Sequence, residues 1–203
     1  HALGIKNLLC ITGDPVRAGD QPDARPVNEY ESVRLLQQVS SFNHSQDPVS
    51  SSLPDGGTTF FPGAAADPNC RSSTSLFRRL ERKREAGARF LQTQMVMDPL
   101  VLRHFCSQIA EPLGLPVLAG VFLLKSARNA EFINRVVPGA CIPERIISRL
   151  NEAVDPASEG VAIAAEQVKD YLDFAQGVHM MAVKAEHLIP KILDEAGINL
   201  QLK

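Results

Sequence analysis

The residues best placed to do chemistry follow the first apolar run of the chain. Leu8–Ile11 contains no polar residue, and Thr12, Gly13 and Asp14 come directly after it. An unbroken apolar run of this length is typical of a strand that is buried on both faces of a parallel sheet. The carboxyl end of such a strand is the edge where parallel sheets and barrels hold their ligands. The same residues also suit an ordinary turn, since Gly, Asp and Pro form turns, so both interpretations stay open at this point.

A cluster of basic residues indicates a second kind of chemistry, the binding of an anion such as phosphate. Six of the 21 basic residues lie in one short stretch: Arg78, Arg79, Arg82, Lys83, Arg84 and Arg89. The alternative is a solvated helix face, because Glu81 and Glu85 interleave with them at a spacing that allows i,i+4 ion pairs.

A polar side chain inside an apolar run marks a third candidate position. Gln94 lies towards the carboxyl end of the run 89–97, and a Gln in a buried strand must be hydrogen-bonded. A ligand and the neighbouring backbone are both suitable partners. The small residues Gly63–Ala66, ahead of Asp67, leave room for a flat or bulky group, or let a helix pack closely.

These residues are positioned by an alternation of apolar runs and helical patterns. The strands are expected at 7–11, 59–66, 89–97, 115–124 and 177–183. The helices are expected at 28–42, 75–88, 98–110, 126–136, 143–153, 155–176 and 186–196, with the tail of another at Ala2–Lys6. This order predicts βαβ units and a parallel sheet, either open and doubly wound or part of a barrel. No Gly-x-Gly-x-x-Gly follows the first strand, which disfavours a dinucleotide-binding Rossmann fold.

Composition narrows the class of protein. The chain has 203 residues, 44% of them hydrophobic, which is enough for one sizeable α/β domain. A net charge of -2 and an aromatic content of 5% without Trp disfavour nucleic acid and anionic membranes as partners. No apolar run approaches the ~20 residues of a membrane span. The four cysteines form no Cys-x-x-Cys pair, so we expect a cytoplasmic protein without a bound metal or a disulfide framework.

The candidate segments together resemble the methylenetetrahydrofolate reductase family, flavin enzymes built on a (β/α)8 TIM barrel. The matching segments are 4–15, 63–69, 80–94, 116–120, 126–131 and 177–181, in the family's order. They cover nearly the whole chain, and 80–94 is the most specific. The resemblance is closer to the bacterial reductases that also occur fused to homocysteine methyltransferases.

The resemblance implies a fold class and a domain organisation. It implies an α/β protein of the (β/α)8 TIM-barrel type in which only the strand 4 to strand 8 portion is present. Residues 1–203 would form a single partial barrel domain that lacks the first three βα units. The family's general-acid Glu lies in those units, and no residue here replaces it. The folate-side Arg of some members is absent, since Ala185 stands at the matching position.

The resemblance also implies roles for individual residues. Asp14 would be catalytic, near the flavin ring and the folate. The cofactor-binding residues would be Thr12, Gly13, Asp14, Asp67, Arg82 and Lys83, with Arg82 and Lys83 near the ribityl and phosphate portion. The substrate-binding residues would be Asp14, Gln94 and Asn129, with Gln94 hydrogen-bonded to the pterin. No residue is expected to bind a metal.

The implied activity is the flavin-dependent reduction of 5,10-methylenetetrahydrofolate to 5-methyltetrahydrofolate in one-carbon and methionine metabolism. FAD would be the cofactor, with NADH or NADPH as reductant. The expected partners are the folate substrate and either further copies of this chain or a chain that supplies the missing barrel units. One alternative is a non-catalytic partial barrel that binds flavin or folate, or is completed by another chain. The other is an unrelated barrel fragment that binds a phosphorylated metabolite at the basic helix.

Overall fold

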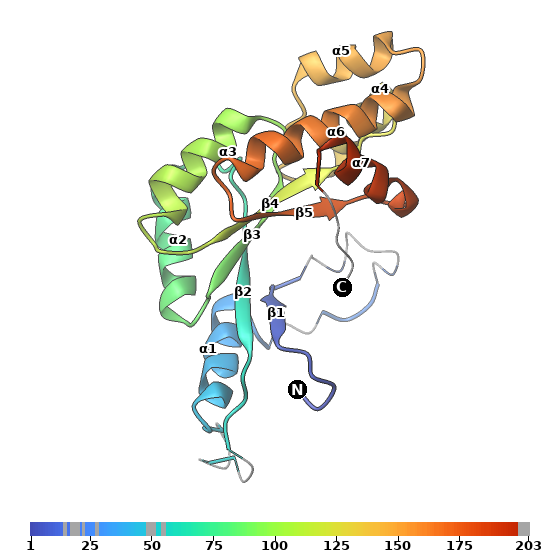
Figure 1. Ribbon diagram of the computed structural model, residues 1–203. Helices are drawn as coiled ribbons and strands as arrows, with labels where there is room; N and C mark the ends of the chain where they lie inside the picture. The colour runs from blue at the N-terminus through green and yellow to red at the C-terminus, as the bar shows by residue number, and fades with distance from the viewer. Residues whose placement is uncertain are drawn as a thin grey trace.

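Five parallel strands form one sheet in the computed structural model, which describes residues 1–13, 16, 21, 23–26, 29–47, 52–53 and 56–198. The strands are β1 (Asn7–Cys10), β2 (Phe61–Ala66), β3 (Phe90–Met95), β4 (Val117–Phe122) and β5 (Gly177–Met181), and they pair in that order. The sheet curls like half of a barrel, with helices along its outer side (Figure 1). The fold class predicted from the sequence, a partial (β/α) barrel, is confirmed.

The helices alternate with the strands, as the βαβ pattern requires. They are α1 (Ser32–Asn43), α2 (Ser73–Glu85), α3 (Pro99–Phe105) with its π-helical continuation η2 (Cys106–Ala110), α4 (Ala127–Val136), α5 (Glu144–Glu152), α6 (Pro156–Leu172), the 3-10 turn η3 (Glu186–Leu188) and α7 (Ile189–Glu195). In the part of the chain that the structure describes, no helix is both long and apolar enough to cross a membrane.

Local sequence signals set where several helices begin. The side chains of Asp98, Ser126 and Asp155 accept hydrogen bonds from the first backbone amides of α3, α4 and α6, which confirms the three predicted caps. Pro99 and Pro156 occupy the first helical position, where a missing N–H costs no hydrogen bond.

Several predicted helix bounds differ from the structure. The helix tail at Ala2–Lys6 is wrong: Gly4 donates its N–H to the His1 carbonyl at 2.8 Å and takes φ +76°, so this glycine closes a turn and not a helix. Helix α6 ends at Leu172 and not near Gln176, because Gln176 is already bound to β4. Its N–H donates to the Val117 carbonyl at 3.1 Å, and its side-chain oxygen accepts from the Val117 N–H at 2.8 Å.

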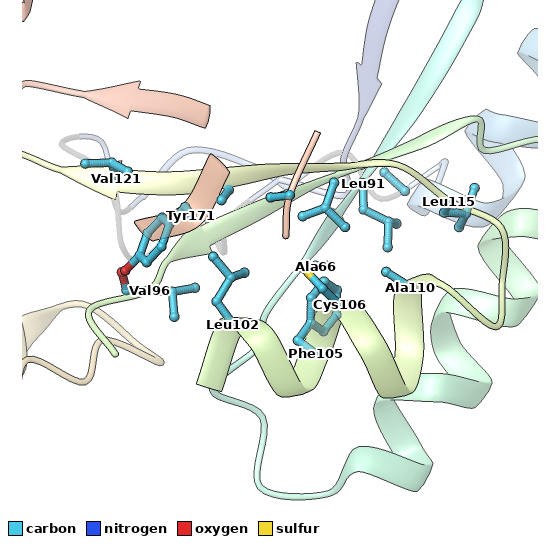
Figure 2. Packing of buried hydrophobic residues seen from close by; sticks show 14 of the residues in the cluster. Ala66, Leu91, Val96, Leu102, Phe105, Cys106, Ala110, Leu115, Val121 and Tyr171 are labelled. Carbon is cyan, nitrogen blue, oxygen red and sulfur yellow. The ribbon is translucent and has the colours of Figure 1, made fainter. Parts of the chain in front are cut away.

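The two faces of the sheet have different environments. The outer face packs against the helices, and Figure 2 shows Leu102 and Phe105 of α3 pointing at the strands. The buried hydroxyl of Tyr171 donates to the Val96 carbonyl just beyond β3 (Figure 2). The inner face is open among the described residues, with 38% of Leu9 and 40% of Phe61 exposed. The sequence predicted strands that are buried on both faces. This prediction is wrong for the inner face, where apolar side chains are exposed among the described residues.

Candidate functional site

A β-bulge in β3 presents Gln94 on the inner face. Gln92 is paired with Leu118 and Met95 with Gly120, so β3 has one residue more than β4 between these pairs. Gln94 is exposed and alternates with the buried Thr93 and Met95. Within the described residues its side chain has no hydrogen-bond partner. The backbone-bonded, structural alternative for Gln94 therefore has no support, and its amide is free to bind a ligand.

Thr93 holds this bulge in place. Its hydroxyl donates to the Gln94 carbonyl at 2.7 Å and accepts from the Gly120 N–H at 2.8 Å, while its side chain is 3% exposed. The hydroxyl thus replaces ladder hydrogen bonds that the extra residue disrupts. A Cβ on Gly120 would lie 2.8 Å from the Thr93 carbonyl oxygen and still closer to that of Gln94, so only glycine fits opposite the bulge.

His179 lies beside Gly120 on β5. The two residues are paired in the sheet. Val178 and Met180 pack into the outer core, so the alternation of the strand turns His179 to the inner face. Partial burial lowers the pKa of the imidazole below its ordinary value, which keeps the ring neutral near pH 7. His179 was not singled out from the sequence, although a His within an apolar strand was a signal that could have found it.

The apolar part of the inner face adjoins these polar groups. A surface cavity of about 440 Å³ lies there, lined by Asn7, Leu8, Leu9, Phe61, Phe90, Gln92, Pro116 and Leu118. Gln92 and Leu118 are two residues below Gln94 and Gly120 along their strands. The inner face therefore combines an apolar floor with hydrogen-bonding side chains at its carboxyl edge, which is the usual composition of a small-molecule site.

The strand-end residues after β1 are only partly described. The Thr12 hydroxyl accepts a hydrogen bond from the Ser32 N–H at 3.0 Å, so it holds the start of α1. Gly13 takes φ +86°, and among the described residues no atom lies within 4 Å of the position that a Cβ would occupy. Asp14 lies outside the described residues, so its catalytic role stays a prediction. The predicted helix start at Asn28 is wrong, because residues 29–31 are not helical and α1 begins at Ser32.

Lys83 reaches the carboxyl end of β2. Its ammonium donates to the Ala65 carbonyl at 2.8 Å, and burial together with the charge of Arg79 lowers its pKa. The last residue of β1 pairs with Ala64, so the Ala65 carbonyl lies just beyond the paired region. This lysine is thus a partly desolvated cation at the edge of the sheet where the candidate site lies.

Arg82 lies on the same helix at the outer surface. Its guanidinium is 3.9 Å from the carboxylate of Glu31, and both side chains are largely exposed. Within the described residues, Glu81 and Glu85 form no ion pair, so the i,i+4 pairs of the solvated-face interpretation are not formed. An exposed pair at this distance is weak, and Arg82 remains free to bind an anion.

Asp67 and the small residues before it take part in packing and in hydrogen bonds within the protein. A Cβ on Gly63 would overlap the ring of Phe90, so the space at this glycine is already filled. One carboxylate oxygen of Asp67 accepts from the Asn69 N–H at 3.0 Å, and the other faces Gly139. Asn69 donates to the carbonyls of Met95 and Gly139, at 3.2 Å each, and ties this loop to the end of β3.

Asn129 belongs to the turn between β4 and α4. Its side-chain oxygen accepts from the Lys125 N–H at 3.3 Å, and its own N–H donates to the Ser126 hydroxyl at 3.1 Å. It lines a surface cavity of about 630 Å³ with Ser126, Arg128, Glu131, Phe132 and Arg135. The structure therefore gives Asn129 a role in the turn, and its contact with substrate stays a prediction.

The fold and the site together define a (β/α) half-barrel that presents polar side chains at the carboxyl edge of its strands, the edge where such barrels bind ligands. Residues 1–197 match the sequence profile of the methylenetetrahydrofolate reductase family. The chain belongs to this family, as the resemblance of its segments predicted.

Two known proteins are similar to this chain. Methylenetetrahydrofolate reductase 2 of Saccharomyces cerevisiae is 25% identical over 209 residues, which are 96% of this chain and 32% of the yeast protein. The chain thus spans about a third of this curated relative. An uncharacterized protein from Clostridium thermocellum, which binds two copies of 5-methyl-5,6,7,8-tetrahydrofolic acid, superposes with a TM-score of 0.56 at 16% identity. The match covers 94% of this chain and 70% of that one, and at this identity it shows a shared fold.

Proposed function

We propose that this chain forms strands four to eight of the barrel of a methylenetetrahydrofolate reductase, as a single domain over residues 1–203. The enzyme would reduce 5,10-methylenetetrahydrofolate to 5-methyltetrahydrofolate, with FAD as cofactor and NADH or NADPH as reductant. The observation that carries the proposal is Gln94, an exposed amide without a protein partner among the described residues, held at the carboxyl edge by the Thr93 bulge. Membership of the family supplies the reaction.

The residues at the β2 edge fit the anionic half of FAD. Lys83 is a partly buried cation that donates to a backbone carbonyl and forms no ion pair with the described residues, and Arg82 is a nearby cation in a weak surface pair. Among the described residues, no atom lies within 4 Å of the position that a Cβ on Gly13 would occupy, so a bulky group can approach the backbone at the end of β1. These residues would hold the cofactor, with Thr12 and Asp67 shaping the adjoining loops. FAD itself would supply hydride transfer.

The chain would work together with further barrel units. The open inner face, with exposed Leu9 and Phe61, is an apolar surface that a closed barrel covers. We propose that three more βα units cover it, supplied by the same protein or by a partner chain, and that the protein acts in the cytoplasm on a folate. The catalytic role of Asp14 and the substrate contact of Asn129 are parts of this proposal.

A second function is a partial barrel that binds flavin or folate without catalysis. The observation in its favour is Ala185, which stands where some relatives have a folate-side Arg and is only 4% exposed. The chain thus offers no cation to the folate at this position. An active enzyme would therefore neutralise its folate by other residues.

The test uses the full-length protein and a matched pair of variants. We expect Gln94→Ala to keep the flavin absorption bands and to weaken 5-methyltetrahydrofolate binding about tenfold, the loss of roughly one good hydrogen bond. Gln108→Ala, at an exposed Gln of η2 on the outer side, is the control. Equal affinity of the Gln94→Ala variant and the parent would refute the role of Gln94. Folate binding without NAD(P)H-dependent turnover would favour the non-catalytic function.

A further inference from the structure

We propose that His179 is a second ligand-binding residue of this site, and that it hydrogen-bonds the pterin ring of the folate from the side opposite Gln94. The proposal rests on the proposed function, since it names a further contact of the same folate site. The resemblance of segment 177–181 to the family gave His179 no role.

The His179 side chain faces the inner side of the sheet. A Cβ on Gly177 would lie 2.9 Å from a methyl carbon of Leu118, and Leu118 lines the inner-face cavity. Gly177 therefore faces inward, and His179, two residues further along the same strand, faces inward as well. The side chains between them and beyond them, Val178 and Met180, pack into the outer core.

Gly120 lies on β4, between the strands that carry Gln94 and His179. This residue separates Gln94 from His179 across the sheet and has no side chain. The bulge also forbids a side chain there, because a Cβ would lie 2.7 Å from the Gln94 carbonyl carbon. Neighbouring strands are about 4.8 Å apart, so β3 and β5 are about 10 Å apart. No side chain of β4 thus stands between the two hydrogen-bonding side chains, and the space beside Gly120 is lined by the backbone carbonyls of the bulge.

The imidazole of His179 has hydrogen-bonding capacity that the described residues do not use. His179 is half-buried, and within the described residues neither ring nitrogen has a hydrogen-bond partner. Burial lowers the pKa of the imidazole and favours its neutral form, which offers one donor and one acceptor. Gln94 also offers both kinds of group. The edge of a pterin carries ring nitrogens, an amino group and a carbonyl, and it matches this pattern on both sides.

The experiment measures the dissociation constant of 5-methyltetrahydrofolate for the full-length protein by calorimetry. His179→Phe keeps the ring shape and removes both nitrogens, and His179→Gln restores a donor and an acceptor. We expect His179→Phe to weaken binding about tenfold and His179→Gln to recover most of the loss. His104→Phe, at an exposed His of α3 on the outer side, is the matched control and should bind like the parent.

The results separate this inference from the proposed function. Parent-like affinity of His179→Phe, with weakened binding in Gln94→Ala, would overturn the role of His179 and leave the folate site standing. A parent protein that binds no folate would overturn both. Because His179→Phe can fail to fold, a second measurement uses the parent protein with 15N-labelled histidine. A shift of the His179 imidazole resonances on adding the folate supports the contact, and unchanged resonances under saturating folate refute it.

Discussion

Replacement of Thr93 by Val tests whether the bulge that presents Gln94 depends on a single hydroxyl. The substitution keeps the shape of the side chain and removes the oxygen. It leaves the buried Gly120 N–H without its 2.8 Å partner and takes away the donor to the Gln94 carbonyl. A buried amide without a partner costs about 1–3 kcal/mol. The bond to the Gln94 carbonyl is partly buried and the bond from the Gly120 N–H is buried, so the Gly120 amide accounts for most of the cost.

The expected loss is therefore about 2 kcal/mol in the free energy of unfolding. For a domain of this size, 1 kcal/mol lowers Tm by roughly 2–4 °C, so Thr93→Val should melt about 4–8 °C lower. The bulge would also relax, so we expect folate affinity to fall together with stability.

The assay is urea unfolding followed by circular dichroism, on the full-length protein and on two variants. Thr74→Val, at an exposed position of α2, controls for the loss of a hydroxyl at the surface. If Thr93→Val and Thr74→Val lower stability by the same few tenths of a kcal/mol, the hydroxyl does not hold the bulge. If stability falls but folate affinity is unchanged, the bulge is structural and does not position Gln94.

Two further predictions concern packing and pH. Gly160→Ala should lower the free energy of unfolding by more than about 3 kcal/mol, measured by urea unfolding. A Cβ at this position of α6 would overlap the Leu124 carbonyl oxygen, so the backbone must move. A loss below about 1 kcal/mol would mean that α6 shifts at little cost. The lowered pKa of His179 means that the unfolded state takes up a proton that the folded state refuses. Stability should therefore fall as pH drops below about 6.5, and His179→Phe should flatten this part of the pH profile; an unchanged slope would contradict the shift.

Local sequence signals determined most of the architecture. Asp98, Ser126 and Asp155 cap helices because a side-chain oxygen next to a helix start can reach only the amides that follow it. The alternation of apolar runs with helical patterns likewise predicted five parallel strands. It left the strand order open, and the family resemblance indicated the barrel order that the sheet adopts. The ordered segments, 80–94 above all, were enough to indicate the family.

Contacts between residues far apart in the chain determine which side chains reach the candidate site. Thr93 binds the Gly120 amide 27 positions away, and this bond decides that β3 bulges and that Gln94 is free. Lys83 likewise meets the Ala65 carbonyl only because helix and strand pack together. His179 joins the site because its strand pairs with Gly120. Hydrophobic pattern and capping act over a few residues and determine the elements, whereas register and bulges depend on how the elements pair, which only the folded sheet specifies.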